Sequence, residues 1–141
     1  MTFADVIKNF SDRGLRTRDI EQYLEAGGNI NRHDECMQYT LLHFAAESCD
    51  VSAIQFLARR GADLQVRDRN GWTPLHTATD GDLDSSSRDG RAATDLPTVR
   101  AFLQLGADTS ARSSDGKTAR DIARGYGQDS LYDSVSQSCL A

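Results

Sequence analysis

The sequence lacks the features of a membrane or secreted protein. No apolar run approaches the length of a membrane span, and Met1 to Asp5 do not form the basic start of a secretory signal. The three cysteines, Cys36, Cys49 and Cys139, are odd in number and unlike a disulfide framework. These absences predict a cytoplasmic protein with no membrane partner.

Basic patches and catalytic constellations are also missing. The formal net charge is -5, and the basic residues are dispersed among acids, so nucleic acid is not an expected partner. The densest basic pair, Arg59 and Arg60, falls where an outer helix is expected to end, and cations there complement the helix dipole. No serine or cysteine nucleophile has a recognisable base beside it. We therefore expect a protein that is not an enzyme and needs no cofactor or metal.

What the sequence does contain is a repeat, clearest in the stretch from Asn70 to His76. Thr73 is suited to cap a helix, Pro74 fits the first helical position, and Gly71 allows a tight turn before them. Weaker copies of the same pattern lie at Tyr39 to Ala46 and at Asp115 to Ala123. The pattern therefore predicts a turn followed by a helix start at each of these three places.

A second motif recurs in step with the first. Gly61-Ala62-Asp63 precedes Thr73 by the same interval at which Gly106-Ala107-Asp108 precedes Thr118. A degenerate form, Gly27-Gly28-Asn29, precedes Thr40 at nearly that interval. Two motifs in fixed spacing indicate a repeat protein, whose neighbouring units bury one continuous core.

In these two motifs the chain resembles the ankyrin repeat family, and the resemblance covers nearly all of its 141 residues. It implies an all-α solenoid of about four helix-turn-helix units with short hairpin-like turns, forming a single domain. The expected units are an N-terminal cap repeat at 1–31, a second repeat at 32–66, a third at 67–110 and a C-terminal cap repeat at 111–141.

Helical spacing of apolar residues predicts most of the individual helices. The expected segments are Thr2 to Phe10, Arg18 to Ala26, Leu41 to Ser48, Val51 to Arg60, an inner helix after Thr73, an outer helix capped by Asp95, and Asp129 to Leu140. A polar connection is expected from Ser11 to Arg18. The third repeat contains an insert, because the stretch from Thr73 to Gly106 is much longer than the equivalent stretch from Thr40 to Gly61. This insert, at about 80–94, is polar and turn-rich, so we expect a mobile loop.

The resemblance also implies a binding surface made of the turns and the exposed side of the inner helices. Tyr39 and Trp72 occupy the same place in successive repeats, so we expect them side by side, where aromatic rings favour binding of another protein. The alternative is that Trp72 packs back on its own hairpin. The main candidate contact residues are Glu35, Met37, Tyr39, Glu47, Arg69, Asn70, Trp72, Asp80, Asp115 and Lys117, with Cys36, Ser48, Ser114, Gly125 and Tyr126 in equivalent positions. We expect a monomer that acts as an adaptor or an inhibitor of a partner protein.

Three groups of residues invite a different chemistry. His43 and His76 are assigned by the resemblance to hydrogen bonds within and between turns. His33 and Cys36 supply two metal ligands without a second pair, which is weak support for a metal site. Asp80, Asp82 and Asp84 match the start of a calcium loop, but Ser85 stands where glycine is needed and Arg91 where glutamate is needed. The alternative function is a metal- or small-ligand-sensing protein that uses the acidic insert at about 80–94.

Overall fold

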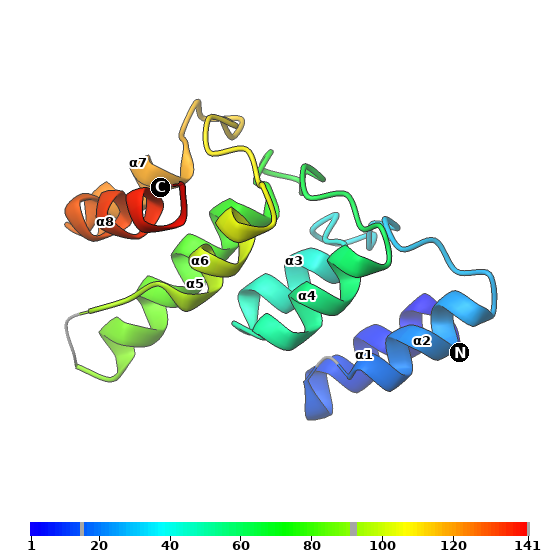
Figure 1. Ribbon diagram of the computed structural model, residues 1–141. Coiled ribbons are helices and arrows are strands. Elements are labelled where there is room, and N and C mark those ends of the chain that lie inside the picture. The colour runs from blue at the N-terminus through cyan, green and yellow to red at the C-terminus, as the bar shows by residue number, and fades with distance from the viewer. Residues whose placement is uncertain (15, 91–92, 141) are drawn as a thin grey trace.

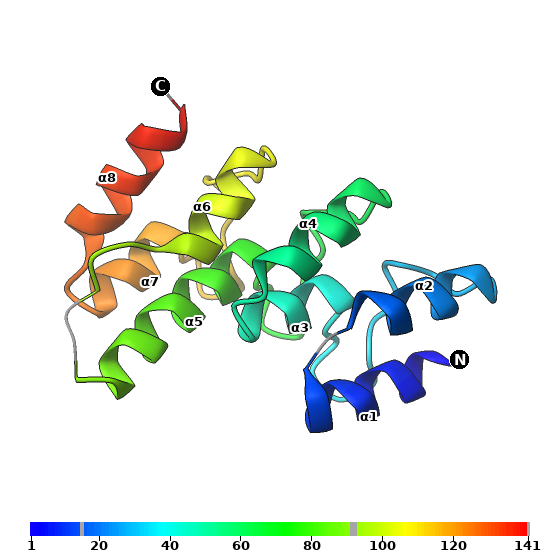
Figure 2. The ribbon, with the colours of Figure 1, turned by 60° about the horizontal axis from the view of Figure 1, so that its bottom comes forward.

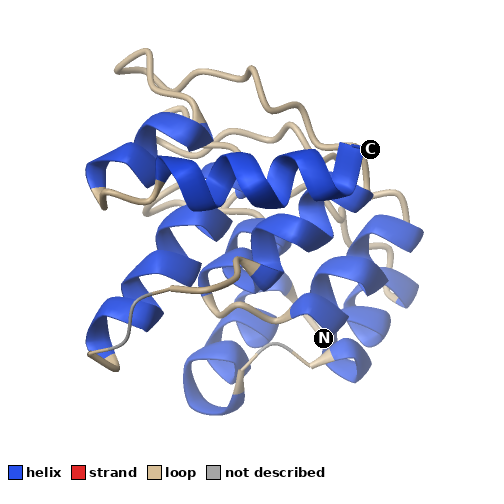
Figure 3. Cartoon of the chain, turned by 60° about the vertical axis from the view of Figure 1, so that its left-hand side comes forward, coloured by secondary structure: helices blue, strands red, loops and turns tan. Residues whose placement is uncertain are grey.

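The computed structural model describes residues 1–14, 16–90 and 93–140 and shows a row of helix pairs (Figure 1). Within this part of the chain there are eight helices and no strand, and loops connect the helices (Figure 3). The helices are α1 (Phe3–Arg13), α2 (Thr17–Glu25), α3 (Leu41–Glu47), α4 (Val51–Arg59), α5 (Pro74–Arg88), α6 (Pro97–Gln104), α7 (Ala119–Gly125) and α8 (Asp129–Leu140).

The helices form two layers. Figure 2 shows α1, α3, α5 and α7 in one row and α2, α4, α6 and α8 in the other, with the two chain ends at opposite ends of the stack. The buried side chains lie between the layers and between neighbouring pairs, including Ile20, Leu41, Ile54, Leu75 and Phe102. The core is therefore a ribbon that runs along the stack, as expected for repeats that pack on their neighbours.

Each inner helix begins with the same reciprocal cap. The backbone N–H of a threonine donates to the side chain three residues later, in the pairs Thr2–Asp5, Thr40–His43, Thr73–His76 and Thr118–Asp121, at 2.9–3.2 Å. This arrangement satisfies backbone groups that a helix end leaves without a partner. The threonine positions deduced from the repeat are thus confirmed as helix starts.

The histidines in two of these caps also join one repeat to the next. His43 Nε2 lies 2.9 Å from the carbonyl oxygen of Trp72, and His76 Nε2 lies 2.8 Å from that of Lys117. Because Nδ1 of each ring accepts from the threonine N–H, the neutral ring donates through Nε2. The expected structural role of His43 and His76 is confirmed. Asp121 forms the same cap, but its carboxylate has no N–H group with which to reach a following turn. Its position in the last repeat requires no such bond.

The insert of the third repeat does not form the expected loop over most of its length. Helix α5 continues to Arg88 and has 15 residues, whereas α3 and α7 have 7 each. Leu83 is buried on this extension, and Arg88 forms an ion pair with Asp84 one turn earlier at 2.8 Å. The sequence of this segment has only a weak intrinsic preference for helix. Burial of Leu83 against the stack supplies the stabilisation that keeps it helical. Residues 91 and 92 lie outside the described residues.

Other boundaries differ in smaller ways. Asp95 does not cap the outer helix of the third repeat; α6 begins at Pro97, and its first N–H groups are capped by Asp82 from the extension of α5. The expected connection from Ser11 to Arg18 is shorter, because α1 continues to Arg13 and α2 begins at Thr17. The last helix has the expected bounds, with Tyr132 and Val135 buried; the side chain of Leu140 lies outside the described residues.

Candidate functional site

A polar pocket of about 280 Å³ lies between the second and third repeats. Tyr39 and Trp72 come from the turns before α3 and α5, Glu47 is the last residue of α3, and the remaining lining residues lie on α5. The pocket is lined by Tyr39, Glu47, Trp72, Thr77, Asp80, Gly81, Asp84, Ser85 and Arg88. Four of the ten main candidate contact residues, Tyr39, Glu47, Trp72 and Asp80, therefore meet around one cavity.

The two aromatic side chains are held by the histidines of the repeat. The Tyr39 ring stacks on His43, with ring centroids 5.3 Å apart, and the Trp72 ring stacks on His76 at 6.1 Å. Both rings remain only half-buried and line the same pocket. Partial burial and nearby carboxylates raise the pKa of Tyr39 to about 12, so its hydroxyl stays protonated at neutral pH. Packing on its own helix thus leaves Trp72 available to a ligand.

The charge of the pocket is acidic. Glu47, Asp80 and Asp84 line it together with one guanidinium, that of Arg88, which pairs with Asp84. Asp80 accepts a hydrogen bond at 2.8 Å from the hydroxyl of Tyr126, whose pKa is raised to about 12 by partial burial and by this carboxylate. Partial burial and the nearby Asp80 carboxylate raise the pKa of Glu47. Negative charge is concentrated here without full compensation.

Close packing of two helices brings Glu47 to the rim of the pocket. A Cβ atom on Gly81 would lie 3.3 Å from the carbonyl oxygen of Ala46 and 3.4 Å from Cys49 Sγ. Such distances leave little room for a side chain, so glycine allows α5 to approach the end of α3. The approach places the acidic end of α3 beside Asp80.

Most of the other candidate residues lie in the turns and do not line the pocket. The backbone N–H of Arg69 donates to the Met37 oxygen at 2.9 Å, and the N–H of Ser114 donates to the Asn70 oxygen at 3.0 Å. These bonds link successive turns, while the side chains of Arg69 and Asn70 stay exposed and Met37 is half-buried. Asp115 and Lys117 are exposed in the last turn. The exposed side chains of Arg69, Asn70, Asp115 and Lys117 thus lie along successive turns, and we call them the rim.

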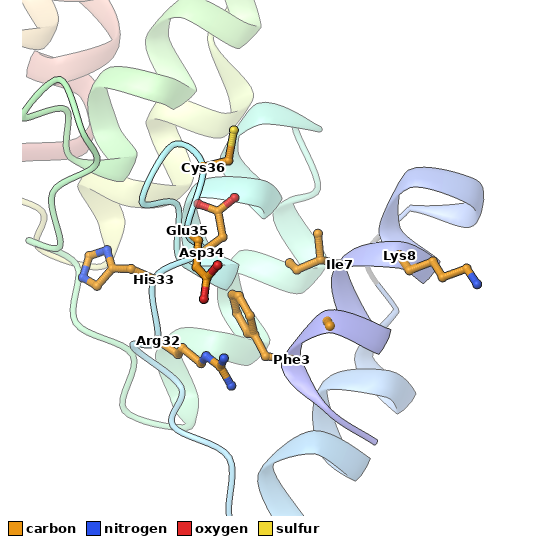
Figure 4. A pocket seen from close by; sticks show the side chains of 9 residues that line it. Phe3, Ile7, Lys8, Arg32, His33, Asp34, Glu35 and Cys36 are labelled. Carbon is orange, nitrogen blue, oxygen red and sulfur yellow. The ribbon is translucent and has the colours of Figure 1, made fainter.

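A larger and more open depression of about 530 Å³ lies near the N-terminus, between α1 and the turn at 32–36 (Figure 4). Phe3 and Ile7 form its apolar side, and the Arg32 guanidinium lies 5.1 Å from the Phe3 ring centre. Glu35 and the exposed Cys36 line its other side, while Lys8 points away from the other labelled side chains in Figure 4. Of the main candidates, only Glu35 lies in this depression.

The sequence interpretation missed the part of the polar pocket that the insert supplies. Gly81, Asp84, Ser85 and Arg88 were not candidate partner contacts, because a loop was expected there, and Thr77 of the expected inner helix was not selected either. One signal was available: Thr77, Gly81, Asp84 and Arg88 are spaced by three or four residues, which places them on one helix face.

The three insert carboxylates point to different partners. Asp80 bonds to Tyr126, Asp82 is buried against α6, and Asp84 pairs with Arg88. Their place on a helix removes the acidic loop on which the sensing hypothesis depended, while Arg91 of that motif lies outside the described residues. Nowhere in residues 1–14, 16–90 and 93–140 do three or more His, Cys, Asp or Glu side chains gather to hold a metal ion, His33 and Cys36 included.

Two further observations bear on the setting of the protein. Cys36, Cys49 and Cys139 are all free thiols. No helix in the described part of the chain is both long and apolar enough to cross a membrane.

Comparison with known proteins identifies the repeat. A family model of ankyrin repeats in three copies matches residues 13–86, and a model of the single ankyrin repeat matches residues 70–114. Both matches overlap the turns and inner helices described above.

Curated relatives agree with the family models. The mouse protein named ankyrin repeat and SOCS box protein 6 is 33% identical over 116 residues, which cover 82% of this chain and 25% of the relative. Mouse protein phosphatase 1 regulatory subunit 27 is 35% identical over 82 residues, covering 57% of this chain and 45% of that protein. The chain thus spans a quarter of the length of the first of these and less than half of the second. The family models, the repeated threonine caps and the stacked helix pairs together show that the chain belongs to the ankyrin repeat family.

Proposed function

We propose that this chain is a non-catalytic protein-binding module that holds a partner across the turns and the exposed side of α3, α5 and α7. The observation that carries the proposal is the meeting of Tyr39, Glu47, Trp72 and Asp80 around one pocket. Tyr39 and Trp72 occupy equivalent places in successive repeats, as do Glu47 and Asp80. The polar pocket would be the centre of the interface, with Arg69, Asn70, Asp115 and Lys117 along its rim.

The physical basis is a preformed surface with aromatic anchors. Tyr39 and Trp72 are held in place by stacking on His43 and His76, so a partner loses little entropy in ordering them. Half-buried aromatic side chains with a polar atom are enriched among residues that dominate binding energy. The charged rim would set the orientation and specificity of the complex.

The family and the relatives support this class of function. Ankyrin repeats are protein-interaction modules, and one relative is by name a regulatory subunit of a phosphatase. For the present chain we propose a role as adaptor or inhibitor of a protein partner, as a monomer in the cytoplasm, with neither nucleic acid nor membrane as partner. A reducing compartment would suit the free and exposed Cys36.

The test is affinity capture with the purified protein as bait in a lysate of its host. A Tyr39→Ala, Trp72→Ala double variant is run in parallel, together with Leu105→Ala as the matched control. Leu105 is an exposed apolar residue at the end of the outer helix α6, so its removal leaves the polar pocket intact. Circular dichroism and a thermal melt establish that each variant is folded.

The captured protein is then purified and titrated against each variant. The proposal expects binding at least about tenfold weaker for the double variant, a loss typical of hot-spot residues, and unchanged binding for Leu105→Ala. Capture of no protein would remove the proposal. Equal affinity for all three chains would place the interface elsewhere.

A further inference from the structure

We propose that the polar pocket between α3 and α5 takes up a single cationic side chain, a lysine or arginine, presented by the partner. This inference rests on the proposed function and adds the chemistry of the partner's central contact. Three observations at the pocket support it independently: a free carboxylate, an unpartnered buried hydroxyl and two aromatic rings.

The carboxylate is that of Glu47. The nearby Asp84 is paired with Arg88, and Asp80 already accepts a hydrogen bond from Tyr126. The Glu47 carboxylate, by contrast, forms no hydrogen bond or ion pair with any described residue, although it lines the pocket. Arg88 does not supply the missing cation, because its side chain is 79% exposed and its guanidinium is taken up by Asp84. A partner's cation would pair with Glu47 and Asp80 without displacing an existing ion pair.

The hydroxyl is that of Thr77, one turn into α5. Thr77 lines the pocket and is only 5% exposed, and its Oγ1 has no hydrogen-bond partner among the described residues. A buried polar atom without a partner is costly, and most such atoms in folded proteins are satisfied. Rotation of the Thr77 side chain would bring this oxygen into the pocket, where an N–H group of a bound ammonium or guanidinium would supply the missing donor.

The third observation is the presence of two aromatic rings, those of Tyr39 and Trp72, in the pocket lining. Both rings line the pocket from the side of the turns. The face of an aromatic ring attracts an ammonium or guanidinium, and tryptophan does so most strongly. Carboxylates beside aromatic rings favour an organic cation over an anion or an uncharged group.

The size and donor set distinguish this ligand from an inorganic cation. A cavity of about 280 Å³ is much larger than a metal ion and has room for the end of a lysine or arginine side chain. Calcium needs six to eight oxygens at about 2.3–2.6 Å, which requires carboxylates that converge on one point. In the described residues no such group of three or more ligands exists.

The single tryptophan of the chain makes a direct test possible. Because Trp72 is that residue and lines the pocket, its fluorescence reports on occupancy. The probe is a blocked pentapeptide with arginine at its centre and glycine elsewhere; a second peptide carries citrulline, which has nearly the same shape but no charge. The inference expects a saturable change with the arginine peptide and binding at least about tenfold weaker for the citrulline peptide.

Variants assign the contact to the pocket. Glu47→Gln removes the free carboxylate and keeps the shape, so the arginine peptide should bind about three- to tenfold more weakly. Glu25→Gln is the matched control, because Glu25 is an exposed acid at the end of α2 outside the pocket, and its affinity should equal that of the parent. Raising the salt concentration should weaken the parent's binding, as expected for an ionic contact.

Several outcomes would overturn the inference. Equal binding of the arginine and citrulline peptides would do so, as would no saturable change up to roughly 10 mM peptide, a concentration far above the dissociation constant of a useful contact. Loss of binding that is equal in Glu47→Gln and Glu25→Gln would indicate nonspecific charge attraction and would also overturn it.

The peptide and capture experiments distinguish a failure of the cation pocket from a failure of the proposed function. If a partner is captured through Tyr39 and Trp72 but is indifferent to Glu47→Gln, and the arginine peptide does not bind, the proposed function stands and the cation pocket is wrong. If the arginine peptide binds with the expected dependence on Glu47 but no protein is captured, the pocket stands and the proposed function is wrong.

Discussion

The carboxylate of Asp82 lies 3.0 Å from the backbone nitrogen of Thr98, 16 residues further along the chain, and accepts its hydrogen bond. The same oxygen, Oδ2, accepts from the N–H of Val99 at 3.1 Å. Burial raises the pKa of Asp82, and these hydrogen bonds oppose that shift. One side chain from the insert therefore caps the outer helix of its own repeat, and the part of the insert that belongs to α5 packs in the stack.

Removal of this cap should destabilise the protein. Asp82→Ala leaves the first N–H groups of α6 without their acceptor in a buried place, so the free energy of unfolding should fall by about 1–2 kcal/mol. Urea denaturation followed by circular dichroism measures the change. Asp84→Ala is the control, because it removes only a surface ion pair and should change stability by less than about 1 kcal/mol. Equal losses would show that the cap adds nothing beyond surface charge.

The C-terminal extension of α5, residues 80–88, should contribute to the stability of the folded protein as the core does. Leu83 is 2% exposed, so Leu83→Ala should lower the free energy of unfolding by about 2–4 kcal/mol through lost burial and a cavity. Ser87→Ala, an exposed change on the same extension, should be close to neutral. Hydrogen exchange at 83–88 in the parent should be slow compared with the exposed turns. Fast exchange at these residues, together with no loss of stability in Leu83→Ala, would show that the segment is a mobile loop.

Gly71 should be irreplaceable in the turn before α5. Its φ of +73° disfavours other residues, and an added Cβ would lie 2.7 Å from the backbone nitrogen of Ser114 in the next turn. We expect Gly71→Ala to cost about 2–4 kcal/mol, the sum of backbone strain and displacement of the neighbouring turn.

Gly116 provides the matched control for that prediction. It has a similar φ of +77°, but nothing lies within 4 Å of an added Cβ. Gly116→Ala should therefore cost only the strain of the left-handed backbone, about 1 kcal/mol. The difference between the two melting curves measures the contact between turns, and equal losses would mean that the turns do not depend on close stacking.

Stability should decrease as the pH falls below neutral. Burial lowers the pKa of His43 and of His76 below the ordinary value of 6.5, although hydrogen bonds to Trp72 and Lys117 and the charge of Asp68 act in the opposite direction. Below pH 6.5 the unfolded chain binds protons that the folded chain does not. The histidine contribution is thus complete above that value and is lost as the pH falls toward the lowered values, by at most about 1.4 kcal/mol per pH unit for each ring.

Urea denaturation at several pH values between 7.5 and 5 checks this prediction, through the change in the free energy of unfolding per pH unit. A His43→Gln, His76→Gln variant should be less stable at pH 7 and should lose most of the slope. If the parent and the variant have the same slope, other groups control the dependence.

Local sequence determined the repeat and its register. A threonine followed three residues later by histidine or aspartate specifies a reciprocal cap, and Gly71 and Gly116 allow the turns before Thr73 and Thr118; these effects act within a few residues. The starts of α3, α5 and α7 and the structural role of His43 and His76 could therefore be predicted. So could the meeting of Tyr39 and Trp72, because repeats in register bring equivalent positions together.

Only the tertiary structure decided the insert and most of the pocket wall. The run from Asp80 to Ser87 is rich in residues that favour turns, and its helix depends on burial of Leu83 and on the Asp82 cap of a helix 16 residues away. Contacts at that distance leave no local pattern. The acidic face that Asp84 and Arg88 add to the pocket exists only because the stack, and not the intrinsic preference of the segment, keeps α5 helical.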